Sequence, residues 1–112
     1  MSQITTHILD TASGKPAIGV RLYLEQKRGN DWQLLASGTT NKDGRVSDLL
    51  PADALLEAGE YRMVFETAPY FEAQNKATFY PQVEIRFYIR DATHYHIPLL
   101  ISPFGYTTYR GS

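Results

Sequence analysis

The stretch that most constrains the fold runs from His94 to Ser112, HYHIPLLISPFGYTTYRGS. Polar and apolar residues alternate along its first half, a pattern typical of a half-buried β-strand. Counting by twos places His94 and His96 on one face, and the opposite, apolar face carries Tyr95, Ile97, Leu99 and Ile101. A Ser-Pro-Phe-Gly turn then precedes a second strand-like run of Tyr and Thr. The pattern predicts a hairpin with two imidazoles turned away from the core.

Similar short alternating runs recur along the rest of the chain between Gly, Pro, Asn and Asp residues. They cover residues 4–9, 20–25, 32–40, 61–66 and 83–90. The last of these is the clearest, because four β-branched or aromatic residues alternate with charged residues and tyrosine. About seven strands at this spacing predict an antiparallel β-sandwich.

Two short segments favour a helix. Residues 52–58 do so by propensity, with Pro51 before them and Gly59 after. Residues 69–77 begin with a proline at a plausible first helical position. Neither segment is longer than about two turns, so the chain is expected to be almost entirely β.

Length and composition exclude several classes of protein. At 112 residues, the sequence predicts a single domain over residues 1–112. A net charge of −1 gives no electrostatic reason to expect nucleic acid or an anionic membrane as a partner. The absence of cysteine excludes disulfides and thiolate chemistry. No segment has the length of a membrane span, and the first residues lack the pattern of a signal peptide, so a cytoplasmic location is expected.

The three histidines are the residues most able to do acid–base chemistry. His7 shares a face of the first strand with Thr5 and Leu9, away from Ile4 and Ile8. A solvated strand histidine is the commoner interpretation of any one of them. The His94-x-His96 spacing could also suit zinc, but no acidic or cysteine partner stands at ligand spacing, so no metal site is predicted.

Other enzyme signatures are missing from the sequence. It contains no Gly-rich phosphate loop, no Gly-x-Ser-x-Gly and no His-Glu-x-x-His. Composition and periodicity alone therefore predict a β-sandwich with polar histidines on its outer face, and they specify no reaction.

Three motifs go further. THILD at residues 6–10 is followed by GKPA at 14–17, TTNKDGR occupies 39–45, and the chain ends in YRGS after the His94 stretch. Together, and in this order, they resemble the signature of the transthyretin-related 5-hydroxyisourate hydrolases. Transthyretin, the hormone carrier, is similar in fold but lacks the histidines and the YRGS ending. One departure is Phe104-Gly105, where relatives commonly carry an aromatic residue and then serine.

The resemblance implies an all-β, transthyretin-like (prealbumin-like) sandwich of two four-stranded antiparallel sheets, with one short helix after the fifth strand. The helix is then expected at residues 69–77 rather than 52–58. The resemblance also implies a homotetramer, a dimer of dimers. In it, the outer faces of the first, seventh and eighth strands meet and line clefts shared between subunits.

Matching positions imply the site residues. His7, Arg45 and His96 would be catalytic, and Tyr109, Arg110, Gly111 and Ser112 would bind substrate, while His94 would be peripheral. The implied reaction hydrolyses 5-hydroxyisourate to 2-oxo-4-hydroxy-4-carboxy-5-ureidoimidazoline in urate (purine) catabolism. Water attacks a cyclic amide carbonyl, and no cofactor takes part.

The chemistry of these side chains fits that reaction. A neutral imidazole, with an ordinary pKa near ~6.5, suits the base, and either His7 or His96 could serve. The planar guanidinium of Arg45 suits the carbonyl and amide edge of the substrate. Ser112 offers a hydroxyl and, as the last residue of the sequence, a carboxylate, and Tyr109 would wall the pocket.

Two alternatives remain open at this point. A transthyretin-like carrier would bind a small ligand without catalysis, although carrier channels favour apolar walls with few polar groups. A structural sandwich that assembles through its edge strands would explain the fold but not the polar ending.

Overall fold

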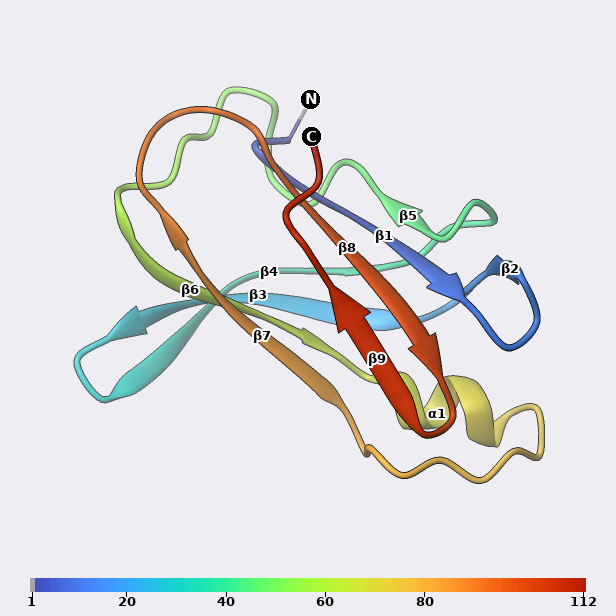
Figure 1. The fold of residues 1–112 in the computed structure, drawn as a ribbon. Helices are drawn as coiled ribbons and strands as arrows, with labels where there is room; N and C mark the ends of the chain where they lie inside the picture. Colours follow the sequence, from blue (N-terminus) through green and yellow to red (C-terminus); the bar gives the residue numbers. More distant parts are fainter. Residues whose placement is uncertain (1) are drawn as a thin grey trace.

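The structure is a computed structural model that describes residues 2–112. Two β-sheets face each other, and a short helix lies at one end of the sandwich (Figure 1). The first sheet comprises β1 (Ile4–Asp10), β2 (Lys15–Pro16), β5 (Arg45–Val46), β8 (Tyr95–Ser102) and β9 (Gly105–Thr108). The second comprises β3 (Arg21–Arg28), β4 (Asp31–Thr39), β6 (Gly59–Phe65) and β7 (Val83–Ile89).

The strand order in the first sheet is β2-β1-β8-β9, with β5 also paired to β1, and in the second it is β4-β3-β6-β7. The predicted two-sheet sandwich is confirmed, with two differences in detail. The first sheet has a fifth member, because β2 and β5 are two-residue strands that share one edge of β1. The pairing of β1 with β8 is parallel rather than antiparallel. These two strands are separated by the whole second sheet, so no hairpin imposes an antiparallel direction on them.

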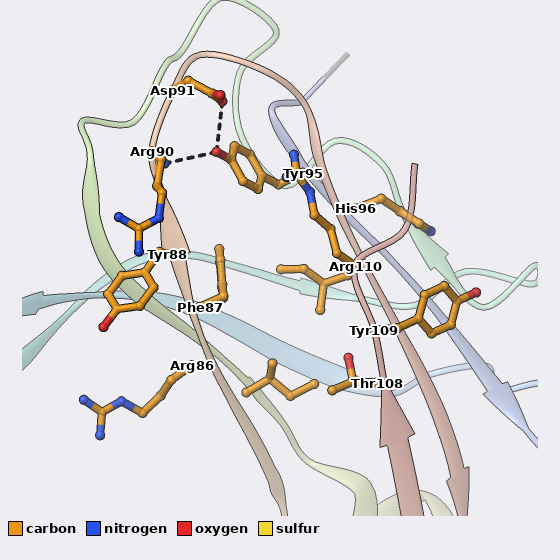
Figure 2. Close-up of a pocket in the computed structure, with 12 residues that line it drawn as sticks. Arg86, Phe87, Tyr88, Arg90, Asp91, Tyr95, His96, Thr108, Tyr109 and Arg110 are labelled. Carbon is orange, nitrogen blue, oxygen red and sulfur yellow. Dashed lines mark hydrogen bonds between the residues drawn. The ribbon is translucent and has the colours of Figure 1, made fainter.

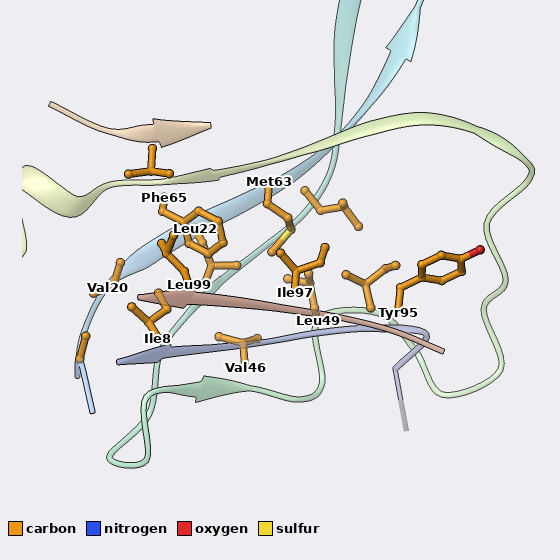
Figure 3. Packing of buried hydrophobic residues seen from close by; sticks show 14 of the residues in the cluster. Ile8, Val20, Leu22, Val46, Leu49, Met63, Phe65, Tyr95, Ile97 and Leu99 are labelled. Atoms are coloured by element: carbon orange, nitrogen blue, oxygen red, sulfur yellow. The ribbon is translucent and has the colours of Figure 1, made fainter. Parts of the chain in front are cut away.

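The alternation predicted from the sequence produces the core between the sheets (Figure 3). Tyr95, Ile97, Leu99 and Ile101, on the apolar face of β8, are each 6% exposed or less. Ile4 and Ile8 of β1 are fully buried beside them. Leu22, Met63 and Phe65 pack onto them from the second sheet. Because successive side chains of a strand point to opposite faces, burying this set turns the intervening polar residues of β1 and β8 outward.

The helix α1 spans Thr67–Glu72, so it begins two residues before the predicted segment 69–77 and ends five residues before the end of that segment. Pro69 lies in the first turn, where the missing N–H costs no helical hydrogen bond. Asn75 adopts φ of 58°, and the Lys76 N–H bonds back to the Phe71 carbonyl, which ends the helix. Among residues 2–112, no helix is both long enough and apolar enough to cross a membrane.

Residues 52–58 form a turn and an irregular loop, so the propensity-based alternative is wrong. The N–H of Leu56 donates to Gln3 Oε1 at 2.8 Å, and the N–H of Leu50 donates to Ser2 Oγ at 3.0 Å. These bonds tie the segment to the start of the chain, and a local propensity contains no information about them.

Candidate active site

The register of the first sheet brings residues that are distant in sequence onto one outer face. His7 of β1 lies opposite Arg45 of β5. Two positions earlier, Thr5 lies opposite His96 of β8, and His96 pairs in turn with Gly111. Since every second residue shares a face, His7, Arg45 and His96 come together on the side away from the core.

A tight turn places Arg45 beside β1. Asn41 Oδ1 accepts hydrogen bonds from the N–H groups of Asp43 and Arg45, at 2.9 and 3.0 Å. Gly44 has φ of +73°, and its carbonyl accepts the Ile8 N–H at 2.8 Å. A Cβ on Gly44 would lie 2.5 Å from the Ile8 carbonyl oxygen. The glycine is therefore required both by its backbone conformation and by the closeness of β1.

The end of the chain packs against His96. The Gly111 N–H donates to the His96 carbonyl at 2.9 Å. A Cβ on Gly111 would lie 2.6 Å from His96 Cδ2, closer than two carbon atoms can approach. The imidazole thus rests on bare backbone, and any side chain at position 111 would push the ring away.

A hollow of about 190 Å³ opens at this place. It is lined by Thr5, Thr6, Arg45, Ser47, His94, His96 and Ser112. A guanidinium, two imidazoles and several hydroxyls thus face one small space on the surface of the sheet. Such a set can accept a proton, stabilise a developing negative charge and hydrogen-bond a polar heterocycle.

The protonation of the two histidines is shifted in the same direction. Burial, followed by the positive charges of Arg45, His94 and His7, lowers the pKa of His96 from the usual 6.5. Burial and then Arg45 also lower the pKa of His7, and Asp43 opposes that shift. Both rings are accordingly held more neutral than free imidazole near pH 7.

The four residues of the predicted binding motif do not share one location. Ser112 lines the hollow, and Gly111 supports His96. In Figure 2, Tyr109 extends to the side of the sheet on which the His96 nitrogens lie, whereas Arg110 turns to the other side. The Arg110 guanidinium lies 4.4 Å from the centre of the Tyr95 ring. The structure therefore brings His7, Arg45, His96 and Ser112 together on the outer face, whereas the Arg110 guanidinium lies over the ring of Tyr95.

Arg110 lines a cavity of about 420 Å³ at the open side of the sandwich, which is bordered by β7 and β8 and is also lined by His96 and Tyr109. There the Tyr95 hydroxyl donates to Asp91 at 2.9 Å and accepts the Arg90 N–H at 3.0 Å, as Figure 2 shows. These contacts fix the entry to β8 from the inner side.

Thr5, Thr6 and Ser47 line the hollow and were not assigned a role from the sequence, and His94, expected to be peripheral, lines it as well. Thr5 is 6% exposed, and its Oγ1 lies 2.8 Å from both His94 Nε2 and His96 Nδ1. The only sign of this in the sequence was that Thr5 stands two positions before His7 and so shares its face of the strand. Nothing in a single sequence reveals which strand lies next to β1. Within residues 2–112, no three His, Cys, Asp or Glu side chains gather as a metal ion would require.

Fold and site together define a two-sheet β-sandwich that carries a histidine–arginine site on the outer face of one sheet. A family model described as the HIUase/Transthyretin family matches residues 4–111. The 5-hydroxyisourate hydrolase of Salmonella dublin is 47% identical over 110 residues, which cover 97% of this chain and 80% of the relative. The chain belongs to the HIUase/Transthyretin family.

Two solved structures show how widely the fold is shared. The 5-hydroxyisourate hydrolase of Klebsiella pneumoniae superposes with a TM-score of 0.85 at 38% identity, over 97% of this chain and 98% of that one. Sea bream transthyretin, in a complex with thyroxine, gives a TM-score of 0.91 at 33% identity, over 98% and 95% of the two chains. Fold alone therefore does not separate a hydrolase from a carrier in this family, and the side chains of the site must do so.

Proposed function

We propose that this protein hydrolyses 5-hydroxyisourate to 2-oxo-4-hydroxy-4-carboxy-5-ureidoimidazoline. The observation that carries the proposal is that Arg45 and His96 line one polar hollow, with His7 paired to Arg45 on the same face of the sheet. The 47% identity to a protein named 5-hydroxyisourate hydrolase supports the same reaction. The place of the reaction in urate breakdown and a cytoplasmic location follow as predictions from the same assignment.

In this mechanism His96 is the base. Its Nδ1 is engaged by Thr5, which leaves Nε2 to receive a proton from water. The lowered pKa keeps the ring neutral and able to accept that proton near pH 7. The water oxygen then bonds to a ring carbonyl carbon, and the carbonyl oxygen becomes an oxyanion.

Arg45 holds that oxyanion. Its guanidinium stays charged at any physiological pH and presents several N–H donors in a fixed plane. Donors of this kind, aimed at developing charge in a partly dehydrated site, typically contribute about 10²–10³ in rate.

The tetrahedral intermediate collapses when the carbon–nitrogen bond of the ring breaks. The leaving nitrogen needs a proton, and His96 now carries the one that it took from water. Because the pKa of His7 is also lowered, a His7 cation is scarce at neutral pH. The same imidazole therefore acts first as base and then as acid, and neutral His7 serves to orient the substrate.

We also propose a homotetramer, built as a dimer of dimers. β4 and β7 end the second sheet, and β9 ends the longer strand path of the first. Unpaired edges favour association with another sheet. The hollow on the outer face of β1 and β8 is open, so a second subunit placed over it would exclude water from the site.

A direct assay tests the proposed reaction. 5-Hydroxyisourate is prepared from urate immediately before use, and its ultraviolet absorbance is followed with and without the protein. The expected result is a faster decay that is proportional to protein concentration. A decay rate equal to that of buffer, with a folded protein, would contradict the proposal.

The second candidate is a carrier, favoured by the TM-score of 0.91 to a transthyretin that binds thyroxine. It predicts that the compound is retained by the protein in equilibrium dialysis while its decay is not accelerated. The polar lining of the hollow makes this the weaker reading, because ligand carriers depend on mostly apolar walls.

A further inference from the structure

Thr5 joins two imidazoles through one oxygen atom. Its Oγ1 lies 2.8 Å from His94 Nε2 and 2.8 Å from His96 Nδ1. The two rings are nearly parallel, with 25° between their planes and 6.3 Å between their centres. Among the described residues, the Thr5 hydroxyl has no other side-chain or backbone partner, and Thr5 is 6% exposed.

Counting protons limits the states of this cluster. A threonine hydroxyl has one proton to donate and two lone pairs, and each neutral imidazole has one N–H and one bare nitrogen. If Thr5 donates to His94 Nε2, then His96 must donate from Nδ1 to Thr5, and His96 Nε2 is bare. If Thr5 donates to His96 Nδ1, the proton of His96 is on Nε2. If both rings donated to Thr5, its hydroxyl proton would be left without a partner in a buried place, which is costly.

The charge of Arg45 distinguishes the first two states. Arg45 lines the same hollow as His96 and adds to the effect of burial in lowering the pKa of that ring. Thr5 engages Nδ1, so Nε2 is the nitrogen left free toward the hollow, and a cation there is attracted to Nε2 when it is bare and repelled when it carries a proton. The state with His96 Nε2 bare is therefore favoured, and it is also the state that a base requires.

We propose that His94 and Thr5 are positioning residues which fix His96 in the tautomer with Nδ1 protonated and Nε2 bare. His94 does so as the acceptor of the Thr5 hydroxyl proton. The inference rests on the proposed role of His96 as base. It gives a function to His94, which the family resemblance implied to be peripheral.

Nitrogen-15 NMR of histidine-labelled protein tests this without substrate. The spectrum is recorded at about pH 8, above the ordinary imidazole pKa of ~6.5, so that the rings are neutral. Protonated and bare ring nitrogens give separate signals, and with three histidines in the chain, a His7→Gln variant and a His94→Gln variant assign them. The expected wild-type pattern for His96 is a protonated Nδ1 and a bare Nε2.

The variants give predictions of opposite sign. His94→Phe removes the acceptor, so the Thr5 hydroxyl turns to His96 Nδ1 and the His96 proton moves to Nε2. His94→Gln keeps an acceptor oxygen at similar reach and should keep the wild-type pattern.

Thr5→Val keeps the shape of the side chain but removes the hydroxyl that contacts both rings, so His96 becomes a mixture of its two tautomers. Thr5→Ser restores the hydroxyl and with it the wild-type pattern. Turnover should fall about 10- to 100-fold in His94→Phe and Thr5→Val, and should stay near wild type in the two conservative variants.

The result that would overturn the proposal is a wild-type His96 with Nε2 protonated, or a His96 pattern that is unchanged in both His94→Phe and Thr5→Val. Failure of the proposed function gives a different result, because the tautomer pattern would then be as expected while the wild-type protein leaves 5-hydroxyisourate untouched. If Thr5→Val does not fold, the comparison of His94→Phe with His94→Gln decides the matter alone.

Discussion

His96 is held by neighbours that act on different parts of it. Thr5 contacts Nδ1, the Gly111 backbone supports the ring, and Arg45 adds to the effect of burial in lowering its pKa. Each neighbour leaves the chemistry of the ring intact and restricts its position or protonation. Substitutions of these neighbours should therefore fall into two groups: those that displace the His96 ring and those that shift the pH dependence of turnover.

Gly111→Ala should lower turnover by about 10²-fold, because the new Cβ would displace the His96 ring and a displacement of about 1 Å can cost that much. Gly105→Ala is the matched control, since a Cβ there would meet only Ser102 Oγ at an ordinary 3.5 Å. Steady-state kinetics and a denaturation curve are measured for both. Equal turnover of the two variants would show that Gly111 does not hold the ring.

Arg45→Gln should raise the pKa of both His7 and His96, since removing the cation removes a cause that lowers each of them. The midpoint of each histidine in an NMR titration then moves to higher pH. Turnover should fall by at least about 10²-fold. As the pH is lowered, the remaining activity should be lost at a higher pH than in the wild type. Arg28→Gln, an exposed arginine paired with Glu57, is the control and should move neither midpoint. Unmoved midpoints in Arg45→Gln would contradict the assignment.

His96→Asn should lose at least about 10²-fold in turnover while the protein stays folded and keeps its assembly state, because an amide cannot accept the proton from water. Ring opening is followed by ultraviolet absorbance, and assembly by light scattering after gel filtration. Near-normal ring opening would exclude His96 as the base.

At the scale of the element, the turn from Asn41 to Arg45 delivers one residue of the site. The Asn41 side chain caps two N–H groups, and Gly44 bonds to β1 in the left-handed conformation. The two-residue strand β5 is too short to be held by its own pairing. The placement of Arg45 beside His7 therefore depends on this turn.

Gly44→Ala should lower the free energy of unfolding by more than Gly29→Ala does. Both glycines have positive φ, +73° and +62°, so both substitutions carry the strain of about 1–3 kcal/mol that this conformation imposes. Only at Gly44 does the added Cβ meet the Ile8 carbonyl, whereas nothing lies within 4 Å of one at Gly29. Urea denaturation measures the difference. Equal losses of unfolding free energy would mean that β1 can move away from the new Cβ without an energetic penalty.

Sequence reasoning succeeded where the determinants are local and failed where they are not. Alternation along β8 identified the buried face and the outward His96, because the side-chain period of a strand is a local property. The loop at 52–58 depends on Gln3, and the bridge between His94 and His96 depends on Thr5, some 90 positions away. The family likeness supplied His7 and Arg45 as partners, which periodicity alone could not join.

For the whole molecule, the two lowered histidine pKa values predict a stability that depends on pH. The unfolded chain takes up protons near the ordinary value of 6.5, whereas the folded chain takes them up only at lower pH. Since the unfolded state then binds more protons, the free energy of unfolding falls as pH drops below about 6.5. Urea denaturation at several pH values between about 5 and 7.5 should show this decline, and a His7→Asn, His96→Asn double variant should flatten it. A decline of equal size in the double variant would assign it to other groups.

The parallel pairing of β1 with β8 has a consequence for how the chain is made. β1 leaves the ribosome about 90 residues before its partner is synthesised, since Thr5 and His96 stand 91 positions apart. Until then, one edge of β1 has no partner from its own sheet and is open to pairing with other chains. Such a distant pairing also makes folding slow. The same pairing assembles the site, so a nascent chain gains its activity only after this strand has docked.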